Sequence, residues 1–283
     1  MDFLSPATWS EALAAKAAYP QALPVLGGTD VMVELNFDRR RPPALLDLGR
    51  VGELTGWAED GDRLRVGAGM TYRRVIEELG DRLPGLATAA RTVGSPQIRN
   101  RGTVGGNLGS ASPAGDAHPP LLAADAEVEV ASVRGTRRIP VRQFFLGPKR
   151  SALAPDELIA AVLVAPAAGA EQFAKIGTRN AMVIAVCSFA LSLDPQRRRV
   201  GTGIGSAAPT PVGAGAAEEF LAGALPWDSR RPLPDALVRH FGVLAADAAA
   251  PIDDVRGTAA YRRHALDVLA RRTLRWGWRQ LCT

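Results

Sequence analysis

Two short glycine-rich segments are the residues in this sequence best suited to hold a ligand. The first glycine turn is Val25-Leu26-Gly27-Gly28-Thr29-Asp30, and the second glycine turn is Thr103-Val104-Gly105-Gly106-Asn107. Glycines let a ligand approach the backbone closely and permit positive φ. Unpaired amides at the start of a helix favour a phosphate. Either turn alone also fits an ordinary strand-to-helix connection, but together they predict a diphosphate held by main-chain amides.

Two aspartates accompany these turns. Asp30 is poorly suited to contact a phosphate, so it is interpreted as a helix cap or a ribose ligand. Asp116 follows the second turn in a stretch, 94–120, that is dense in Gly, Pro, Ser and Asn and has no room for a long strand. A buried loop of this kind needs partners for its backbone donors, which a polyphosphate supplies. Asp116 then either accepts hydrogen bonds from ribose hydroxyls or caps a helix at Pro119–Ala124.

Other kinds of chemistry find little support. The segment Gly201-Thr-Gly203-Ile-Gly205 lacks the spacing of a dinucleotide-binding fingerprint and leads into Ser-Ala-Ala-Pro rather than a helix. Two cysteines cannot supply a four-cysteine cluster or zinc site, and the three histidines lack metal-ligand spacing. We therefore predict no catalytic side chain and no metal ligand, and expect a bound cofactor to carry the reaction. The residues concerned are Cys187, Cys282, His118, His240 and His264.

Composition narrows the classes of protein to which this chain can belong. The chain has 283 residues, 47% of them hydrophobic, and 34 basic against 29 acidic side chains give a net charge of +5. The basic runs Arg39-Arg40-Arg41 and Arg197-Arg198-Arg199 lack the interleaved aromatics that stack bases, so nucleic acid is not expected as a partner. No apolar run approaches the roughly 18–20 residues of a membrane span, and no signal peptide is visible. These features predict a cytoplasmic protein without a membrane span.

The first glycine turn is predicted to belong to a small parallel α/β lobe, residues 1–53. Thr8 is expected to cap a helix at Glu11–Ala18. A strand at Leu23–Leu26, a helix at Thr29–Asn36 and a strand at Ala44–Leu48 follow. This order places the glycine turn between a strand and a helix.

The second turn is predicted to lie in a mixed α/β lobe, residues 54–168. Alternating or apolar segments predict strands, and Thr71 and Pro84 are expected to open helices. The predicted strands are Arg63–Val66, Glu127–Val130, Arg138–Val141 and Leu158–Val164. The two lobes together form the expected N-terminal domain, 1–168.

Residues 171–283 are predicted to form a C-terminal domain after an Ala-Gly linker. An antiparallel sheet is expected first, and a helical bundle after it. The predicted strands are Phe173–Ile176, Val183–Leu193 and Val200–Ser206, and the predicted helices are Ala214–Leu221, Pro234–Ala246 and Ala259–Trp276. The fold class is therefore α+β.

The order of these motifs resembles that of a known family. The two glycine turns, Ile98 to Leu108 and Ser112-Pro113-Ala114-Gly115-Asp116 are similar to the FAD-binding medium subunits of the xanthine dehydrogenase and carbon monoxide dehydrogenase family of molybdenum hydroxylases. The likeness continues through Lys175 to Arg179, Ala207 to Pro211 and Asp254 to Arg263, and so covers nearly the whole chain.

The resemblance implies a function and a set of contacts. It implies that FAD lies between the two N-terminal lobes, with both glycine turns on its pyrophosphate and Asp116 near its ribose. Lys175 matches a flavin-contacting lysine of the family, and Ile159 is expected near the ring. It also implies two partners, a molybdopterin-binding large subunit and a [2Fe-2S] small subunit. Electrons would pass through FAD to an external acceptor, which is NAD, a quinone or another molecule.

Two other functions remain open at the level of sequence. One is a self-contained FAD-dependent oxidoreductase, which requires an acid or base near the flavin. The other is a non-catalytic assembly module of the same complex, which keeps the fold without the flavin. Electron transfer itself requires only proximity and a suitable potential, so catalytic side chains are not needed for the leading hypothesis.

Overall fold

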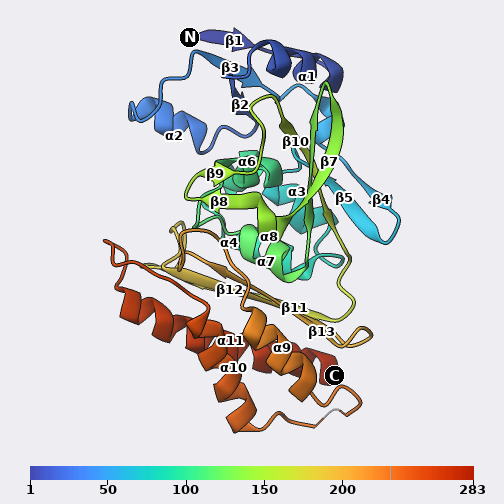
Figure 1. The fold of residues 1–283 in the computed structure, drawn as a ribbon, viewed down its shortest axis with the longest axis vertical. Coiled ribbons are helices and arrows are strands. Elements are labelled where there is room, and N and C mark those ends of the chain that lie inside the picture. The colour runs from blue at the N-terminus through green and yellow to red at the C-terminus, as the bar shows by residue number, and fades with distance from the viewer. Residues whose placement is uncertain (230) are drawn as a thin grey trace.

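The computed structural model describes residues 1–229 and 231–283 and has three layers along its long axis (Figure 1). The N-terminal layer is a parallel sheet in the order β1-β3-β2, with β1 at Asp2–Leu4, β2 at Leu23–Val25 and β3 at Ala44–Asp47. Helix α1, Trp9–Ala18, begins with a capping box between Thr8 and Glu11, as the sequence predicts. The sequence did not reveal β1, whose side chains are mostly exposed and carry no apolar alternation.

Helix α2, Val31–Asn36, begins two residues later than predicted. Gly28 has φ of +75°, so the chain leaves β2 through a left-handed turn before the helix starts. Asp30 occupies the position before the helix but makes no side-chain capping hydrogen bond. Its predicted role as a cap is therefore wrong.

The middle layer contains a five-stranded antiparallel sheet in the order β4-β5-β10-β6-β7. Its central strand, β10 at Leu158–Val164, is buried along its whole length, which explains its unbroken apolar sequence. The other strands are β4 at Trp57–Asp60, β5 at Arg63–Gly67, β6 at Glu127–Ser132 and β7 at Gly135–Pro140, with a small hairpin of β8 at Phe145–Gly147 and β9 at Arg150–Ser151. The predicted strand at Arg138–Val141 ends one residue early because Val141 begins a helix.

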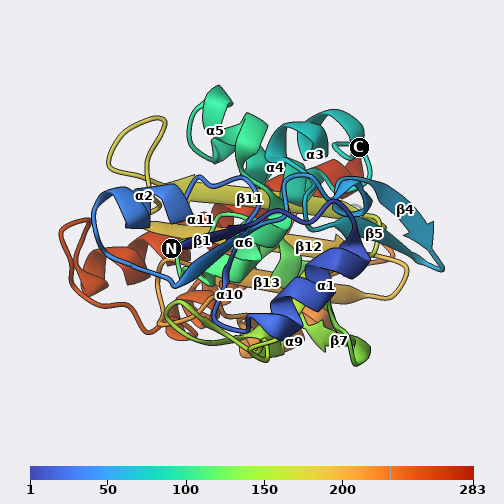
Figure 2. The ribbon, with the colours of Figure 1, turned by 90° about the horizontal axis from the view of Figure 1, so that it is seen from above.

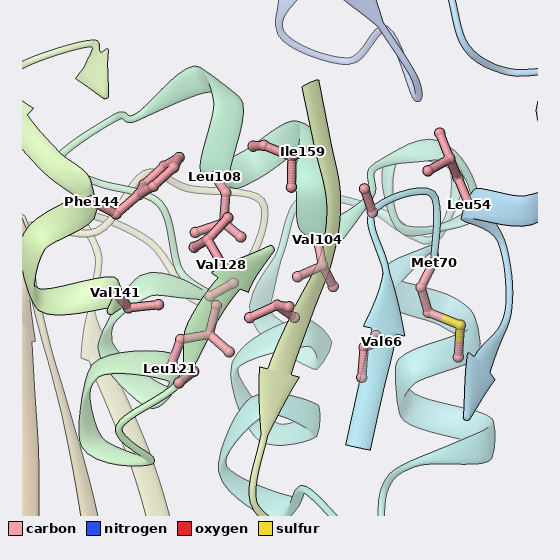
Figure 3. Close-up of a cluster of buried hydrophobic side chains, with 14 of the residues drawn as sticks. Leu54, Val66, Met70, Val104, Leu108, Leu121, Val128, Val141, Phe144 and Ile159 are labelled. Carbon is pink, nitrogen blue, oxygen red and sulfur yellow. The ribbon is translucent and has the colours of Figure 1, made fainter. Parts of the chain in front are cut away.

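Helices pack against this sheet and enclose the larger hydrophobic core (Figure 3). Residues 94–120 form short helices rather than the loop predicted from their composition, because Ser95 and Thr103 each cap a helix through a side-chain oxygen. The helices are α3 at Tyr72–Glu78, α4 at Pro84–Thr92, α5 at Pro96–Arg101, α6 at Val104–Ser110, α7 at His118–Ala123 and α8 at Val141–Phe144, and a 3₁₀ turn lies at Gly52–Leu54.

The C-terminal layer is an antiparallel sheet in the order β11-β12-β13, as predicted. Its strands are β11 at Ala170–Ile176, β12 at Cys187–Asp194 and β13 at Arg199–Gly205, and its helices are α9 at Gly215–Ala224, α10 at Asp235–Asp247 and α11 at Ala259–Cys282. The prediction of a strand from Val183 was wrong for its first four residues. The ladder with β11 begins only at Cys187, opposite Ile176, and 177–186 form an irregular connection.

Alternating glycines join the middle layer to this sheet. A Cβ atom on Gly201 would lie 1.9 Å from the carbonyl oxygen of Ala123, and one on Gly203 would lie 2.0 Å from that of Pro119. A Cβ on Gly205 would lie 2.9 Å from the Pro119 ring. Because side chains alternate along a strand, these glycines share the face on which α7 rests. The segment that failed as a dinucleotide fingerprint is therefore a flat packing surface.

Candidate functional site

The two glycine turns lie directly against each other. A Cβ atom on Gly27 would sit 2.0 Å from the carbonyl oxygen of Arg101 and 3.1 Å from the Cα of Gly102, just before the second turn. The hydroxyl of Ser110, at the end of α6, donates a 2.7 Å hydrogen bond to the carboxylate of Asp30. Figure 2 shows the N-terminal lobe lying over α6. The predicted convergence of the turns is thus present in the structure.

Four of the five amides in the second turn, from Val104 to Asn107, already have acceptors within the chain. The amide of Val104 donates to Met70 O at 3.1 Å and that of Gly105 to Ala68 O at 2.9 Å. The amide of Gly106 donates to Thr103 Oγ1 at 3.0 Å, and that of Asn107 to Thr103 O at 3.0 Å. The hypothesis of bare amides in both turns is therefore wrong for residues Val104 to Asn107 of the second turn. Gly105 is needed for packing, because a Cβ atom added at this position would lie 2.4 Å from the Cβ of Ala68.

The first turn does offer free donors. Within residues 1–229 and 231–283, no acceptor is recorded for the main-chain amides of Gly27, Gly28, Thr29 and Asp30. The carbonyl of Gly28 accepts from Met32, so the turn is ordered while its amides stay available. A run of unpaired amides at a turn before a helix is a recognised type of anion-binding site.

A cleft of about 250 Å³ opens beside these turns. Its wall includes three of the predicted site residues, Asp30, Asn107 and Asp116. The remaining lining residues are Val93, Gly94, Ala114, Gly115, Met182, Val183 and Ile184. The last three also line an adjoining cleft of about 400 Å³ with Thr178, Arg179 and Arg256. Sequence reasoning missed Val93–Gly94 and Met182–Ile184. The signal for the first pair was the glycine itself, because Gly94 has a positive φ of 44°.

Two buried oxygen atoms in the cleft wall lack partners. They are Oδ1 of Asn107 and Oδ1 of Asp116, neither of which has a hydrogen bond in the described structure. Buried polar atoms are nearly always paired, so unpaired acceptors in a cleft indicate a ligand with donors such as ribose hydroxyls or a ring N–H. The hydroxyl of Tyr72 is also buried and unpaired, and burial raises the pKa of this phenol well above its usual value, so it stays a neutral donor.

Asp116 and Lys175 form a buried ion pair at the back of the cleft. Their atoms Oδ2 and Nζ are 2.6 Å apart, and each side chain is only 10% exposed. Burial raises the pKa of Asp116, although Lys175 opposes that shift. The ammonium group of Lys175 also donates to Thr92 O at 2.9 Å and to Val183 O at 3.3 Å. Asp116 therefore does not cap α7, and Lys175 lies behind Asp116 rather than among the lining residues.

Three further predicted site residues, Val25, Leu26 and Ile159, do not line the cleft. Val25 ends β2 and Leu26 packs partly against the core. Ile159 is 8% exposed and lies on β10 beside Val104 and Leu108 of α6 (Figure 3). None of these three side chains lines the cleft in the described part of the chain.

His118 supports the cleft from within the core. Its Nε2 lies 3.1 Å from Asn107 O, and its ring contacts Phe145 with centroids 4.5 Å apart. A Cβ on Gly115 would lie 2.3 Å from the His118 ring, so the turn that carries Asp116 rests on this imidazole. The residue is thus a neutral histidine that packs inside the core.

The burial of His118 predicts an acid-sensitive fold. Burial lowers the pKa of His118 to about 4 from an unfolded value of 6.5. Between these values the unfolded chain binds the proton and the native chain does not, so stability is complete above pH 6.5 and falls as pH falls towards 4. The loss should reach about 3 kcal/mol. Urea unfolding at pH 7 and pH 4.5 measures it, and His118→Phe should flatten this part of the profile. An unchanged profile in that variant contradicts the prediction.

Comparisons with known proteins identify the family of this chain. Residues 1–167 match a family model described as the FAD binding domain in molybdopterin dehydrogenase, and residues 172–276 match the CO dehydrogenase flavoprotein C-terminal domain. The chain is 31% identical to a xanthine dehydrogenase FAD-binding subunit of Escherichia coli O157:H7, over 95% of this chain and 92% of that protein. It is also 31% identical to a nicotine 6-hydroxylase medium subunit of Paenarthrobacter nicotinovorans, over 96% and 95%.

Solved structures give the same result. A chain in the structure of reconstituted CO dehydrogenase from Oligotropha carboxidovorans superposes with a TM-score of 0.91 at 26% identity, covering 99% of this chain and 98% of that one. One of CO dehydrogenase from Hydrogenophaga pseudoflava superposes with a TM-score of 0.90. Along the described residues, no helix is both long enough and apolar enough to cross a bilayer. The chain therefore belongs to the family of FAD-binding subunits of xanthine dehydrogenase- and CO dehydrogenase-type molybdenum hydroxylases, oxidoreductases in which FAD is the cofactor of this subunit.

Proposed function

We propose that this chain is the electron-transfer flavoprotein subunit of a three-part complex. In this proposal a [2Fe-2S] small subunit delivers electrons that originate at a molybdopterin-binding large subunit, and an external acceptor takes them up. FAD, when bound, supplies the redox chemistry, because it exchanges electrons with both one-electron and two-electron partners. The names of the relatives as FAD-binding or medium subunits support the assignment of partners.

The residues in the cleft fit this cofactor. The free amides of Gly27 to Asp30 would hold the diphosphate, and the unpaired oxygens of Asn107 and Asp116 would accept from its ribose or ring donors. We further propose that Thr103, Val104, Gly105 and Gly106 shape the second turn so that the first can lie against it. Val25, Leu26, Ile159 and Lys175 would then act behind the cleft, positioning the groups that touch FAD.

One observation favours electron transfer over substrate chemistry by this chain alone. The cleft wall holds two carboxylates, and both are engaged, Asp30 by the hydroxyl of Ser110 and Asp116 by the ammonium of Lys175. In this proposal the remaining oxygen of Asp116 accepts a hydrogen bond from the cofactor, which leaves this carboxylate no site for a substrate proton. We therefore place substrate oxidation outside this chain.

Purification of the complex from its native host tests the proposal. We expect two further subunits to co-purify, with molybdenum and iron present by metal analysis, and no turnover of small donors by the isolated flavin-loaded chain. Turnover by the isolated chain would favour a self-contained oxidoreductase. A complex assembled with a flavin-free variant that still reduces its acceptor at the full rate would favour an assembly module.

We also propose that the chain is divided into an N-terminal domain, 1–168, with lobes 1–53 and 54–168, and a C-terminal domain, 171–283. Separate hydrophobic clusters support this division. One joins the N-terminal lobe to the middle layer, and the other lies between the C-terminal sheet and α9, α10 and α11.

A further inference from the structure

Strand β11 holds helix α4 at both of its ends. At the amino end, the amide of Gly85 donates a 3.0 Å hydrogen bond to Oε2 of Glu171. At the carboxyl end, Nζ of Lys175 donates a 2.9 Å hydrogen bond to the carbonyl oxygen of Thr92. The contact is close, because a Cβ atom on Gly85 would lie 3.0 Å from the same Glu171 oxygen. The helix belongs to the middle layer and the strand to the C-terminal sheet.

The lengths and charges of the two elements match. The four residue steps from Glu171 to Lys175 span about 13 Å of strand, and the nine residues of α4 span about 13 Å of helix. The amino end of a helix carries partial positive charge and the carboxyl end partial negative charge. The ammonium of Lys175 therefore complements the helix dipole at the carboxyl end, and the side chain of Glu171 supplies a hydrogen-bond acceptor at the amino end. One strand supplies both groups.

This arrangement bears on the cleft because α4 leads directly into it. Val93 and Gly94 follow the last residue of the helix and line the cleft wall. Lys175 reaches the same end of the helix and also binds Asp116. Glu171 holds the opposite end and does not line the cleft. A displacement of the amino end of α4 is therefore transmitted along the helix to the cleft wall.

We propose that Glu171 is a positioning residue for the FAD cleft, which it acts on from the C-terminal sheet by fixing the amino end of α4. The proposal rests on the placement of FAD in this cleft. It adds to that placement a dependence of cofactor affinity on a residue outside the FAD-binding lobes.

Glu171 also has an unusual protonation equilibrium. Burial raises its pKa to about 7, while the Gly85 amide from α4 and the charge of Arg199 from β13 act to lower it. From β12 its paired residue is the uncharged Ser192. Since the clamped state binds the proton more tightly than an exposed glutamate does, linkage stabilises the clamp fully below the ordinary pKa of 4.5, and this stabilisation is lost as pH rises through 7. FAD affinity should therefore decline as pH rises through 7.

Titration of the flavin-free full chain with FAD, followed by quenching of flavin fluorescence, tests this role. We expect Glu171→Leu, which leaves the Gly85 amide without an acceptor, to raise the dissociation constant of FAD about tenfold. Gly85→Ala, which pushes on the carboxylate from the other side, should have a similar effect. Glu171→Gln keeps the acceptor and cannot ionise, so it should bind FAD like the wild type at pH 6 and about threefold more tightly at pH 8.5. The matched control is Glu219→Leu, on the exposed surface of α9.

Two results would overturn the proposal. One is wild-type affinity in folded Glu171→Leu and Gly85→Ala, with folding checked by thermal unfolding. The other is a pH profile of Glu171→Gln that coincides with that of the wild type; the titration of Asp116 is common to both proteins and cancels. If Gly27→Val loses FAD and these variants do not, only the role of Glu171 fails. If Gly27→Val keeps FAD, the placement of the cofactor itself fails.

Discussion

Gly27→Val should purify as a folded protein without its flavin, with a dissociation constant for FAD about 100-fold above that of the wild type. The added Cβ would lie 2.0 Å from the Arg101 carbonyl oxygen, which is a main-chain atom that cannot turn aside. The two glycine turns must then separate. Forcing extra atoms into a packed contact costs about 3 kcal/mol, which is equivalent to about 100-fold in affinity. Absorbance at the flavin bands after purification, followed by titration with FAD, measures the effect.

Gly223→Val serves as the matched control for this experiment. Gly223 lies on α9, and a Cβ atom there would meet no atom within 4 Å. This variant should keep its full complement of flavin. If Gly27→Val also keeps it, the apposition of the two turns does not form the FAD site.

Lys175→Met should destabilise the chain by about 3–5 kcal/mol at pH 8, because it leaves Asp116 as a buried charge without its counterion. Each partner of this pair is 10% exposed, so solvent does little to compensate. Without the lysine the pKa of Asp116 rises further, and the native state takes up a proton that the unfolded state does not. The destabilisation should therefore be smaller at pH 5.5 than at pH 8, as measured by urea unfolding at both values.

The same substitution at a second lysine provides the control. Lys149 pairs with Glu34, but its side chain is 66% exposed. Lys149→Met should cost less than about 1 kcal/mol, as is usual for surface pairs. The double variant Asp116→Asn with Lys175→Met should recover part of the lost stability, since no buried charge remains. Equal losses in the two single lysine variants would refute a special role for the buried pair.

The sequence predicted the parts of this structure that depend on local chemistry. The cap at Thr8, the buried strand at Leu158–Val164 and the antiparallel C-terminal sheet follow from hydrogen-bonding side chains and hydrophobic periodicity, and all three were confirmed. The convergence of the two glycine turns was also predicted, although the glycines were interpreted as making room for a ligand and Gly27 instead lies against the Arg101 carbonyl. These features are determined by short stretches of sequence.

The errors arose where distant segments supply the partners. The amides of Val104 and Gly105 have acceptors on Met70 and Ala68, which are more than thirty residues away in sequence. No local pattern reveals those bonds, so the second turn was interpreted as a source of free donors. Likewise, the pairing of Lys175 with Asp116 joins two layers of the fold. The sequence alone identified Lys175 and Asp116 as site residues but did not show that they pair with each other.

The glycines on one face of β13 limit which amino-acid substitutions this protein can accept. Hydrogen is the smallest side chain and a methyl group is the next, and even a methyl group would overlap a main-chain carbonyl here. Gly201 and Gly203 therefore cannot be replaced stepwise by slightly larger residues. Neighbouring Thr202 is buried on the opposite side of the sheet and donates a hydrogen bond to Glu218, and Val200 and Ile204 are larger apolar side chains buried on that same side. Random mutagenesis with selection for soluble protein should therefore yield almost no replacements at Gly201 and Gly203, whereas apolar exchanges of similar volume at Val200 and Ile204 should survive more often.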